Sequence, residues 1–158
     1  FSWIQKSATQ GNADGEYGLG YLYAKGQGTP QDYTQAFNWY QKAAEQGDAD
    51  AELNLGDLYD DGKGVPQDHT QAFNWFQKAA EQGDAVAENN LGLDYAQGVG
   101  TPQDYTQALN WLQKSAAQSN ADACQSLSYM YSNGLGVPVD HQQAQYWEQM
   151  AKQLGGGN

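Results

Sequence analysis

Residues 49–80 read ADAELNLGDLYDDGKGVPQDHTQAFNWFQKAA, and the pattern of this stretch returns every 36 residues along the 158-residue chain. All tryptophans and all prolines keep this period, at Trp3, Trp39, Trp75, Trp111 and Trp147 and at Pro30, Pro66, Pro102 and Pro138. Self-similarity at a fixed period of roughly 20–50 residues is the signature of a repeat architecture. We therefore predict a single repeat domain over residues 1–158, with full repeats at 11–46, 47–82, 83–118 and 119–154.

Both ends of the chain depart from the full repeat. Residues 1–10 align with the last ten residues of the first full repeat, so they form the tail of an incomplete repeat. Phe1, Trp3 and Ile4 in this tail would leave an apolar face uncovered, and we expect self-association through it. Residues 155–158, GGGN, offer no side chain for packing, and we expect a flexible tail there.

Each repeat predicts two helices joined by a turn. The first helix begins after a residue whose side chain can accept a first-turn N–H, at Asn12, Asp48, Asp84 and Asn120. It ends at paired glycines, such as Gly62 and Gly64, which tolerate positive φ. The second helix begins after Asp68, with Gln71 as its capping-box partner, and carries Trp75 on an apolar stripe. Since no segment alternates with a period of 2, the fold class is all-α.

Composition excludes several classes of partner. Seven lysines, no arginine and 19 acidic residues give a formal net charge of −12. Nucleic acid is excluded as the main partner because phosphate binding needs clustered basic residues, and anionic membrane surfaces are disfavoured for the same reason. No apolar run approaches the roughly 20 residues of a membrane-spanning helix, so we expect no membrane insertion. Cys124, the single cysteine, cannot form an internal disulfide.

The second repeat resembles the Sel-one-like repeat (SLR) family, which is related to the tetratricopeptide repeat. The resemblance rests on Ala49, Leu55, Gly56, Tyr59, Gly62, Gly64, Pro66, Asp68, Ala72, Trp75, Lys78, Ala79 and Ala80. It implies a right-handed superhelix of stacked helix pairs, a solenoid that scaffolds other proteins, and it favours a bacterial periplasmic or secreted protein. The fourth repeat departs from the pattern, with Ser128 in place of the glycine and Met150 in place of the lysine.

Residues that change from repeat to repeat fall on one stripe of the first helix, which we call the variable face. They recur at i, i+3, i+7 and i+10, as at positions 14, 17, 21 and 24. In related solenoids the first helices line the concave surface, so the resemblance implies that this face binds partners. The candidate binding residues are Tyr17, Tyr21, Leu53, Asp57, Asp60, Asn89, Leu93, Gln125 and Tyr129. The alternative is that these side chains only fill the space between adjacent first helices.

The acidic residues of the second repeat favour a basic ligand or the N-terminus of a helix. Asp50, Asp57, Asp60 and Asp61 would form an acidic patch there. The sequence therefore favours a protein or peptide ligand with basic character.

Residues that recur in every repeat are best explained by packing. We expect Trp75 to lie in the core and Lys78 to act near a helix C-terminus. Asp94 stands where other repeats have Leu22, Leu58 or Met130, and it either points inward as a buried acid or is turned outward by a local rotation.

No set of side chains indicates an enzyme, a metal site or a cofactor. His69 and His141 lie two repeats apart, and Cys124 stands where other repeats have Glu16, Glu52 or Glu88. We therefore expect a non-catalytic protein-binding or peptide-binding scaffold. One cysteine-rich branch of the SLR family is associated with penicillin binding, but this chain has neither the paired cysteines nor a Ser-x-x-Lys motif. A β-lactam-binding or hydrolysing enzyme is thus a disfavoured alternative, and a structural spacer within a larger protein is another.

Overall fold

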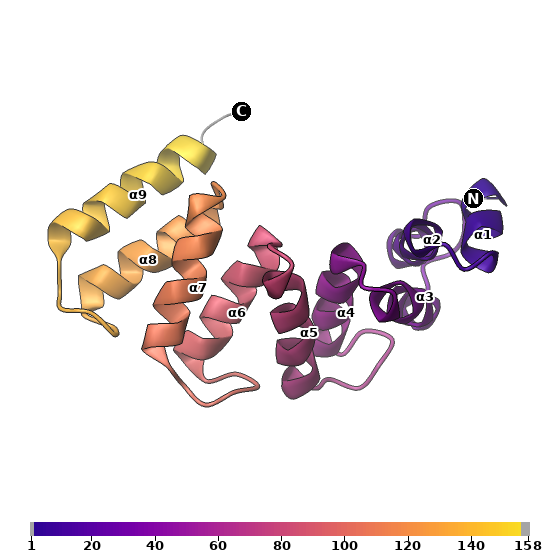
Figure 1. The fold of residues 1–158 in the computed structure, drawn as a ribbon, viewed down its shortest axis with the longest axis horizontal. Coiled ribbons are helices and arrows are strands. Elements are labelled where there is room, and N and C mark those ends of the chain that lie inside the picture. Colours follow the sequence, from indigo (N-terminus) through magenta and orange to yellow (C-terminus); the bar gives the residue numbers. More distant parts are fainter. Residues whose placement is uncertain (1, 156–158) are drawn as a thin grey trace. The chain divides into compact units, whose positions relative to one another are not determined.

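The computed structural model describes residues 2–155, and in this part of the chain every regular element is a helix. Figure 1 labels the helices. They are α1 (Ser2–Thr9), α2 (Ala13–Lys25), α3 (Tyr33–Glu45), α4 (Ala49–Asp61), α5 (His69–Glu81), α6 (Ala85–Gln97), α7 (Tyr105–Ala117), α8 (Ala121–Asn133) and α9 (His141–Gly155). The prediction of an all-α fold with two helices in each repeat is confirmed. Residue 1 and the last three residues of the expected tail lie outside the described part, whereas Gly155 ends α9.

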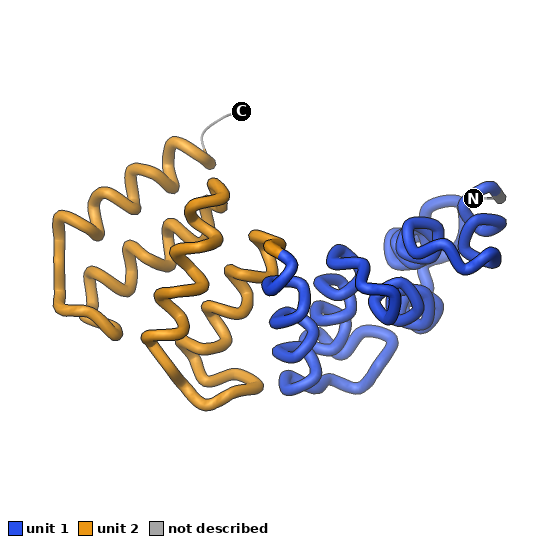
Figure 2. Tube along the Cα trace, in the orientation of Figure 1, with its two compact units in different colours: residues 1–82 blue, residues 83–158 orange. Residues whose placement is uncertain are grey.

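The chain forms two compact units (Figure 2). Unit 1 comprises residues 1–82 with helices α1 to α5, and unit 2 comprises residues 83–158 with helices α6 to α9. Within each unit, every helix packs against the helix that precedes or follows it in the chain. Contacts between chain neighbours are what a stack of repeats requires, because each repeat buries its apolar face against the next one.

The ends of the helices are fixed by the predicted capping residues. The side chains of Asn12, Asp48, Asp84 and Asn120 each accept a hydrogen bond from the backbone N–H three residues later, at 2.7–3.0 Å. Asp32 accepts from the Gln35 N–H at 3.0 Å in the same way at the start of α3. At the C-terminus of α4, Gly62 is left-handed, with φ +66°, and its N–H donates to the Leu58 carbonyl. These local bonds explain why helices α2 to α8 all have 13 residues.

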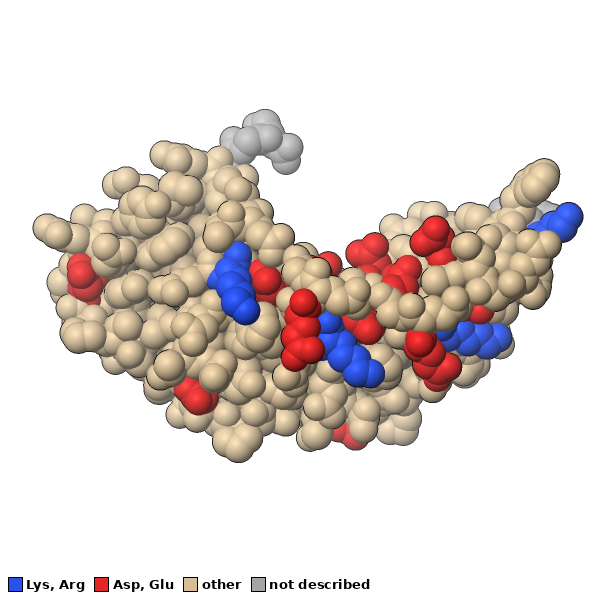
Figure 3. Space-filling view, in the orientation of Figure 1, with Lys and Arg blue, Asp and Glu red and all other residues tan. Residues whose placement is uncertain are grey.

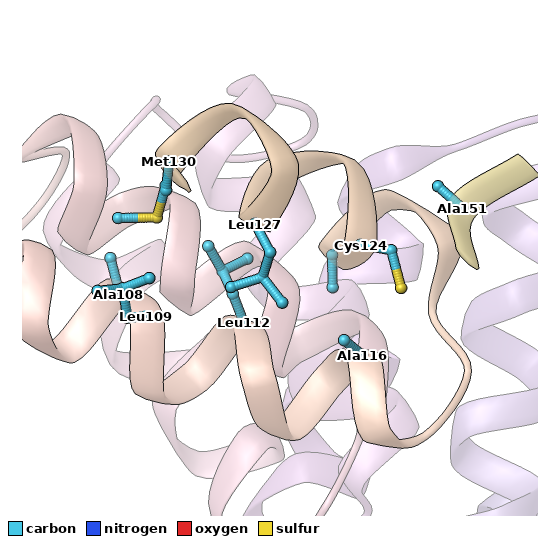
Figure 4. Close-up of a cluster of buried hydrophobic side chains, with 9 residues drawn as sticks. Ala108, Leu109, Leu112, Ala116, Cys124, Leu127, Met130 and Ala151 are labelled. Atoms are coloured by element: carbon cyan, nitrogen blue, oxygen red, sulfur yellow. The ribbon is translucent and has the colours of Figure 1, made fainter. Parts of the chain in front are cut away.

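A repeated leucine of the first helix lies at the centre of each core. Leu19, Leu55, Leu91 and Leu127 are at most 1% exposed. In unit 1, Leu55 packs with Ala36, Tyr40, Ala51 and Leu58. In unit 2, Figure 4 shows that side chains of α7 and α8 point toward one another, with Leu112 and Leu127 between the helices.

The repeated tryptophans are less buried than the leucines. Trp75 packs against the core cluster of unit 1, as predicted, but its ring remains partly exposed. Lys78 covers the ring, with its Nζ 3.9 Å from the ring centroid, and Lys42 and Lys114 lie at 4.1 and 3.8 Å from Trp39 and Trp111 in the same way. Each lysine therefore makes a cation–π contact in addition to its favourable place near a helix C-terminus.

The departures in the fourth repeat have structural causes. In the other full repeats a helix glycine faces a large side chain, as Gly92 faces Leu112, where an added Cβ would lie 2.7 Å from the Leu112 Cγ. The residue equivalent to Leu112 in α9 is the exposed Glu148, which leaves space for Ser128. Ser128 uses this space to donate a hydrogen bond from its Oγ to the Ala144 carbonyl at 2.8 Å. Met150, in place of the lysine, packs with Trp147 against the core of unit 2.

At the N-terminus, Trp3 is 85% exposed and Ile4 is partly buried. Phe1 lies outside the described residues, and self-association through this face stays a prediction. Among residues 2–155, no helix combines the length and the apolar character that crossing a membrane requires.

Candidate functional site

In α2, two tyrosines of the variable face connect the core with the surface. Tyr21 is exposed, and Tyr17 beside it is partly buried, with 6.5 Å between the ring centroids. Tyr17 also contacts the fully buried Tyr40, at 5.8 Å between centroids. Burial raises the pKa of the Tyr17 hydroxyl, and the charges of Asp50 and Asp48 raise it further. A rigid, neutral aromatic surface of this kind is typical of protein-binding sites.

In α4, the variable face carries acidic groups, some of which have basic partners. Leu53 and Asp60 are partly buried, and Asp57 is exposed. The Asp60 Oδ1 lies 2.6 Å from the His69 Nδ1, and Asp61 forms an ion pair with Lys63 at 2.8 Å. Figure 3 shows acidic side chains gathered over the part of unit 1 that contains α4.

A pocket of unit 1 lies beside these residues. It has a volume of about 260 Å³, and Tyr40 and Leu58 from the core contribute to its lining. Asp57, Asp61, Lys25 and Lys63 also line it, so both signs of charge are present. Of the predicted binding residues in unit 1, only Asp57 belongs to the lining of this pocket.

In unit 2, three of the predicted residues come together at a larger pocket, of about 630 Å³. Leu93 from α6 and Gln125 and Tyr129 from α8 line it, and Tyr129 is 64% exposed. The fourth residue, Asn89, is only 6% exposed and is not part of the lining. Its Oδ1 is buried and has no hydrogen-bond partner among the described residues.

The two pockets occupy equivalent places in the repeat pattern. Tyr33, Tyr40, Asn54, Asp57, Leu58 and Lys63 of the unit 1 pocket correspond, 72 residues later, to Tyr105, Leu112, Ser126, Tyr129, Met130 and Leu135 of the unit 2 pocket. A glutamine from the turn lines each pocket and makes the same two hydrogen bonds in both. The Nε2 of Gln31 donates to the Ala24 carbonyl at 2.8 Å and to the Tyr33 hydroxyl at 3.0 Å, and Gln103 makes the same bonds to Ala96 and Tyr105.

Sequence reasoning missed these turn and second-helix residues. The signal that could have found them is the pair Gln31 and Tyr33, which returns as Gln103 and Tyr105. A pocket at the junction of two repeats is thus a feature that the repeat itself builds.

A buried carboxylate joins the start of the first helix to the end of the second helix in three of the repeats. Glu16, Glu52 and Glu88 are at most 5% exposed, and each accepts a hydrogen bond from a glutamine 30 residues later, at 2.6–2.8 Å. In the fourth repeat the two equivalent positions are Cys124 and Leu154, so both members of the pair are exchanged for apolar residues together. Cys124 is fully buried, and burial raises the pKa of its thiol. The thiolate that nucleophilic chemistry requires is therefore disfavoured.

Replacing Glu88 by Gln is expected to stabilise the protein more at pH 7 than at pH 4. Burial raises the pKa of the Glu88 carboxyl, and the hydrogen bond from Gln118 opposes this only in part. A raised folded-state pKa contributes stability below the unfolded pKa, near 4.3, and this contribution is lost as the pH rises through the folded value. A glutamine keeps an acceptor for Gln118 and carries no charge.

Urea denaturation of the wild type and Glu88→Gln at several pH values measures this difference. Glu81→Gln, which changes an exposed glutamate, is the control. A Glu88→Gln effect that is the same at pH 4 and pH 7 would show that the buried carboxylate is not destabilising.

The remaining candidates give no reactive arrangement. Among residues 2–155, no group of three or more His, Cys, Asp or Glu is placed to hold a metal ion. Asp94 and Leu93 are both partly buried, so neither of the two expected arrangements, full burial of the acid or burial of Leu93 in its place, is reached.

The chain matches the family model described as Sel1 repeat over residues 13–48, 49–84, 85–120 and 121–156. These windows have the predicted period and begin two residues after the boundaries drawn from the sequence. No curated protein matches the chain significantly.

Solved structures similar to this chain include two close relatives. A protective antigen of uropathogenic Escherichia coli with an SLR fold is 41% identical, with a TM-score of 0.95, and the match covers 98% of this chain and 33% of the antigen. A Sel1 repeat protein from Oxalobacter formigenes is 35% identical, with a TM-score of 0.91, over 99% of this chain and 64% of that protein. This chain thus spans about one third of the first protein and just under two thirds of the second.

A more distant structure shares the fold. Cysteine rich protein B of Helicobacter pylori is 23% identical, with a TM-score of 0.63, over 80% of this chain and 90% of that protein. Together with the family model, these structures confirm the predicted fold class, an all-α solenoid of helix-turn-helix repeats.

Proposed function

The chain belongs to the Sel1 repeat family, and we propose that it is a non-catalytic scaffold that binds proteins or peptides through the variable faces of α2 and α4 in unit 1 and of α6 and α8 in unit 2. Sel1 repeat proteins are in general protein-interaction scaffolds, which supports the class of function. The observation that carries the proposal for this chain is the exposure of large aromatic side chains at variable positions. Tyr21 is 38% exposed and Tyr129 is 64% exposed, although neither residue is required by the repeat.

The charge of the chain supports a partner with basic character. The formal net charge is −12, and lysines are the only fully charged basic side chains. A partner that presents lysine or arginine would be attracted over a distance of about 10 Å at moderate salt, whereas an acidic partner would be repelled. We therefore expect binding to weaken as the salt concentration rises.

Neither alternative has an observation in its favour. For an enzyme that binds or hydrolyses β-lactams, the one cysteine is buried and its thiol pKa is raised. For a spacer, length would matter and the chemistry of the variable face would not. The spacer therefore makes a different prediction from the scaffold in the following experiment.

Replacing both Tyr21 and Tyr129 by alanine is expected to weaken partner retention at least about tenfold, because tyrosine is enriched among the interface residues whose truncation costs more than about 1 kcal/mol. The immobilised chain is used to capture proteins from a bacterial lysate, which are quantified by mass spectrometry, and the affinity of the purified partner is then measured by calorimetry. Tyr146→Ala, which removes a tyrosine that is 51% exposed on α9, is the matched control. Equal retention by the wild type, the double variant and the control would refute binding through the variable face and favour the spacer.

A further inference from the structure

We propose that the pocket of unit 2 binds a large apolar side chain of a peptide whose neighbouring residues are lysine or arginine. This proposal rests on the scaffold function and names the class of ligand that one part of the variable face takes.

The pocket has an apolar floor and an apolar wall. Leu112 and Met130 form the floor, and both belong to the buried core of unit 2 (Figure 4). Leu93 from α6, Leu135 from the turn after α8 and the exposed Tyr129 provide further apolar surface. A volume of about 630 Å³ lies within the range of roughly 300–1,000 Å³ that is usual for ligand sites. The floor is therefore rigid, and an apolar side chain that enters the pocket loses its contact with water.

Polar groups at the same pocket suit a peptide backbone. The carboxamides of Gln97 and Gln125 line the pocket, and both residues are exposed. A carboxamide donates and accepts hydrogen bonds, as a peptide group requires. An apolar cavity with a few polar groups at its opening binds a side chain inside and holds the main chain across the opening.

The equivalent pocket of unit 1 shows that packing between repeats does not require this apolar lining. Where unit 2 has Tyr129 and Leu135, unit 1 has Asp57 and Lys63. Where unit 2 has Gln97, unit 1 has Lys25. Equivalent helices and turns form the two pockets, so the repeat tolerates charged residues at these positions. Because the fold does not require apolar residues at these positions, we attribute the apolar lining of the unit 2 pocket to the binding of an apolar side chain.

Charge around the pocket selects the residues that flank the apolar side chain. None of the described residues that line the unit 2 pocket is charged. Unit 2 as a whole has seven acidic residues and two lysines, which gives a formal net charge of −5. Asp122 is exposed and lies three residues before Gln125 and seven before Tyr129, which places these three residues on one face of α8. A basic residue next to the bound side chain would lie near this carboxylate, and an acidic one would be repelled.

A selection of random linear peptides displayed on phage, with the full chain as the target, tests the proposal. We expect the selected peptides to contain Leu, Ile, Met, Phe or Trp next to Lys or Arg. Their dissociation constants are then measured by fluorescence anisotropy. Replacing the apolar residue by alanine, or the basic residues by glutamate, is expected to weaken binding at least about tenfold.

The protein variants that test the site introduce residues of the unit 1 pocket into the unit 2 pocket. Tyr129→Asp combined with Leu135→Lys introduces the residues that unit 1 has at these positions, and we expect it to weaken binding at least about tenfold. Tyr146→Asp, on α9, is the matched control and should leave binding unchanged. Thermal unfolding of each variant checks the fold, and Tyr129→Ala, at a position that is 64% exposed, replaces the double variant if that one is unstable.

The following results would overturn the proposal. Peptides that bind the wild type and the double variant equally would place the site elsewhere, although the scaffold function would stand. Selected peptides that are acidic, or that lack an apolar residue, would refute the ligand class. A selection that yields no peptide would refute a linear-peptide ligand, while the capture experiment with Tyr21→Ala and Tyr129→Ala tests the scaffold function independently.

Discussion

Leu55→Ala is expected to lower the free energy of unfolding by about 3–5 kcal/mol. Leu55 is fully buried in unit 1 between α3 and α4, where it packs with Tyr40, Ala36 and Leu58. Removing three carbon atoms there takes away buried apolar surface and also leaves a cavity that the surrounding helices can fill only in part. The loss is a large fraction of the roughly 5–15 kcal/mol that stabilises a natural domain.

Urea denaturation followed by circular dichroism measures this loss, and Leu53→Ala is the matched control. Leu53 is two residues earlier on α4, belongs to the variable face and is only partly buried. The same chemical change there is expected to cost less than about 1.5 kcal/mol. Equal losses at the two positions would contradict the assignment of one leucine to the core and the other to the surface.

Hydrogen exchange of Leu55→Ala adds a spatial readout. Because each helix packs against its neighbours in the chain, the largest loss of protection is expected in α3, α4 and α5. A loss that is uniform over the described residues would instead indicate a fully cooperative array.

The helices could be predicted from the sequence because their signals are local. Asp48 and Gly62 fix the two ends of α4 through bonds to the backbone of the same helix. The period of 36 residues places equivalent residues in every full repeat. The family resemblance could be recognised for the same reason. Local chemistry of this kind does not depend on how the repeats stack.

Contacts between residues that are far apart in the sequence could not be predicted in this way. The bond between Glu52 and Gln82 spans 30 residues, and the only trace in the sequence is that the fourth repeat changes both positions together, to Cys124 and Leu154. Trp75 keeps the period as strictly as Leu55, yet its ring stays partly exposed and is covered by a lysine, whereas Leu55 is fully buried. Repetition therefore indicates that a residue is needed for the fold, but not how deeply it is buried.

The variable face was predicted in part. Helical spacing places Leu93 and Tyr129 on the same side of their helices, and both line the unit 2 pocket. Asn89 has the same spacing and is buried. Burial at such a position depends on the length of the side chain and on the neighbouring helix, and neither is contained in the period. The second-helix residue Tyr105 lines the pocket although it is not on the variable face at all.

Gly64→Ala is expected to lower the free energy of unfolding by about 2–5 kcal/mol. Gly64 has φ +73°, a conformation that costs other residues about 1–2 kcal/mol. In addition, a Cβ at this position would overlap the backbone carbonyl of Tyr33, in the preceding repeat, and would lie 2.8 Å from the Thr34 nitrogen. Backbone atoms cannot rotate away as a side chain does, so the two repeats would have to move apart, at about 1–3 kcal/mol.

Gly47→Ala separates the two contributions to this loss. Gly47 has φ +85°, but a Cβ there would meet no atom within 4 Å, so only the conformational part of about 1–2 kcal/mol is expected. The difference between the urea midpoints of Gly64→Ala and Gly47→Ala then measures the close approach of one repeat to the next. Gly136 makes the same approach to Tyr105 in unit 2, so this second glycine of the turn sets the distance between repeats. Equal losses at Gly64 and Gly47 would instead show that the turn requires glycine only for its positive φ.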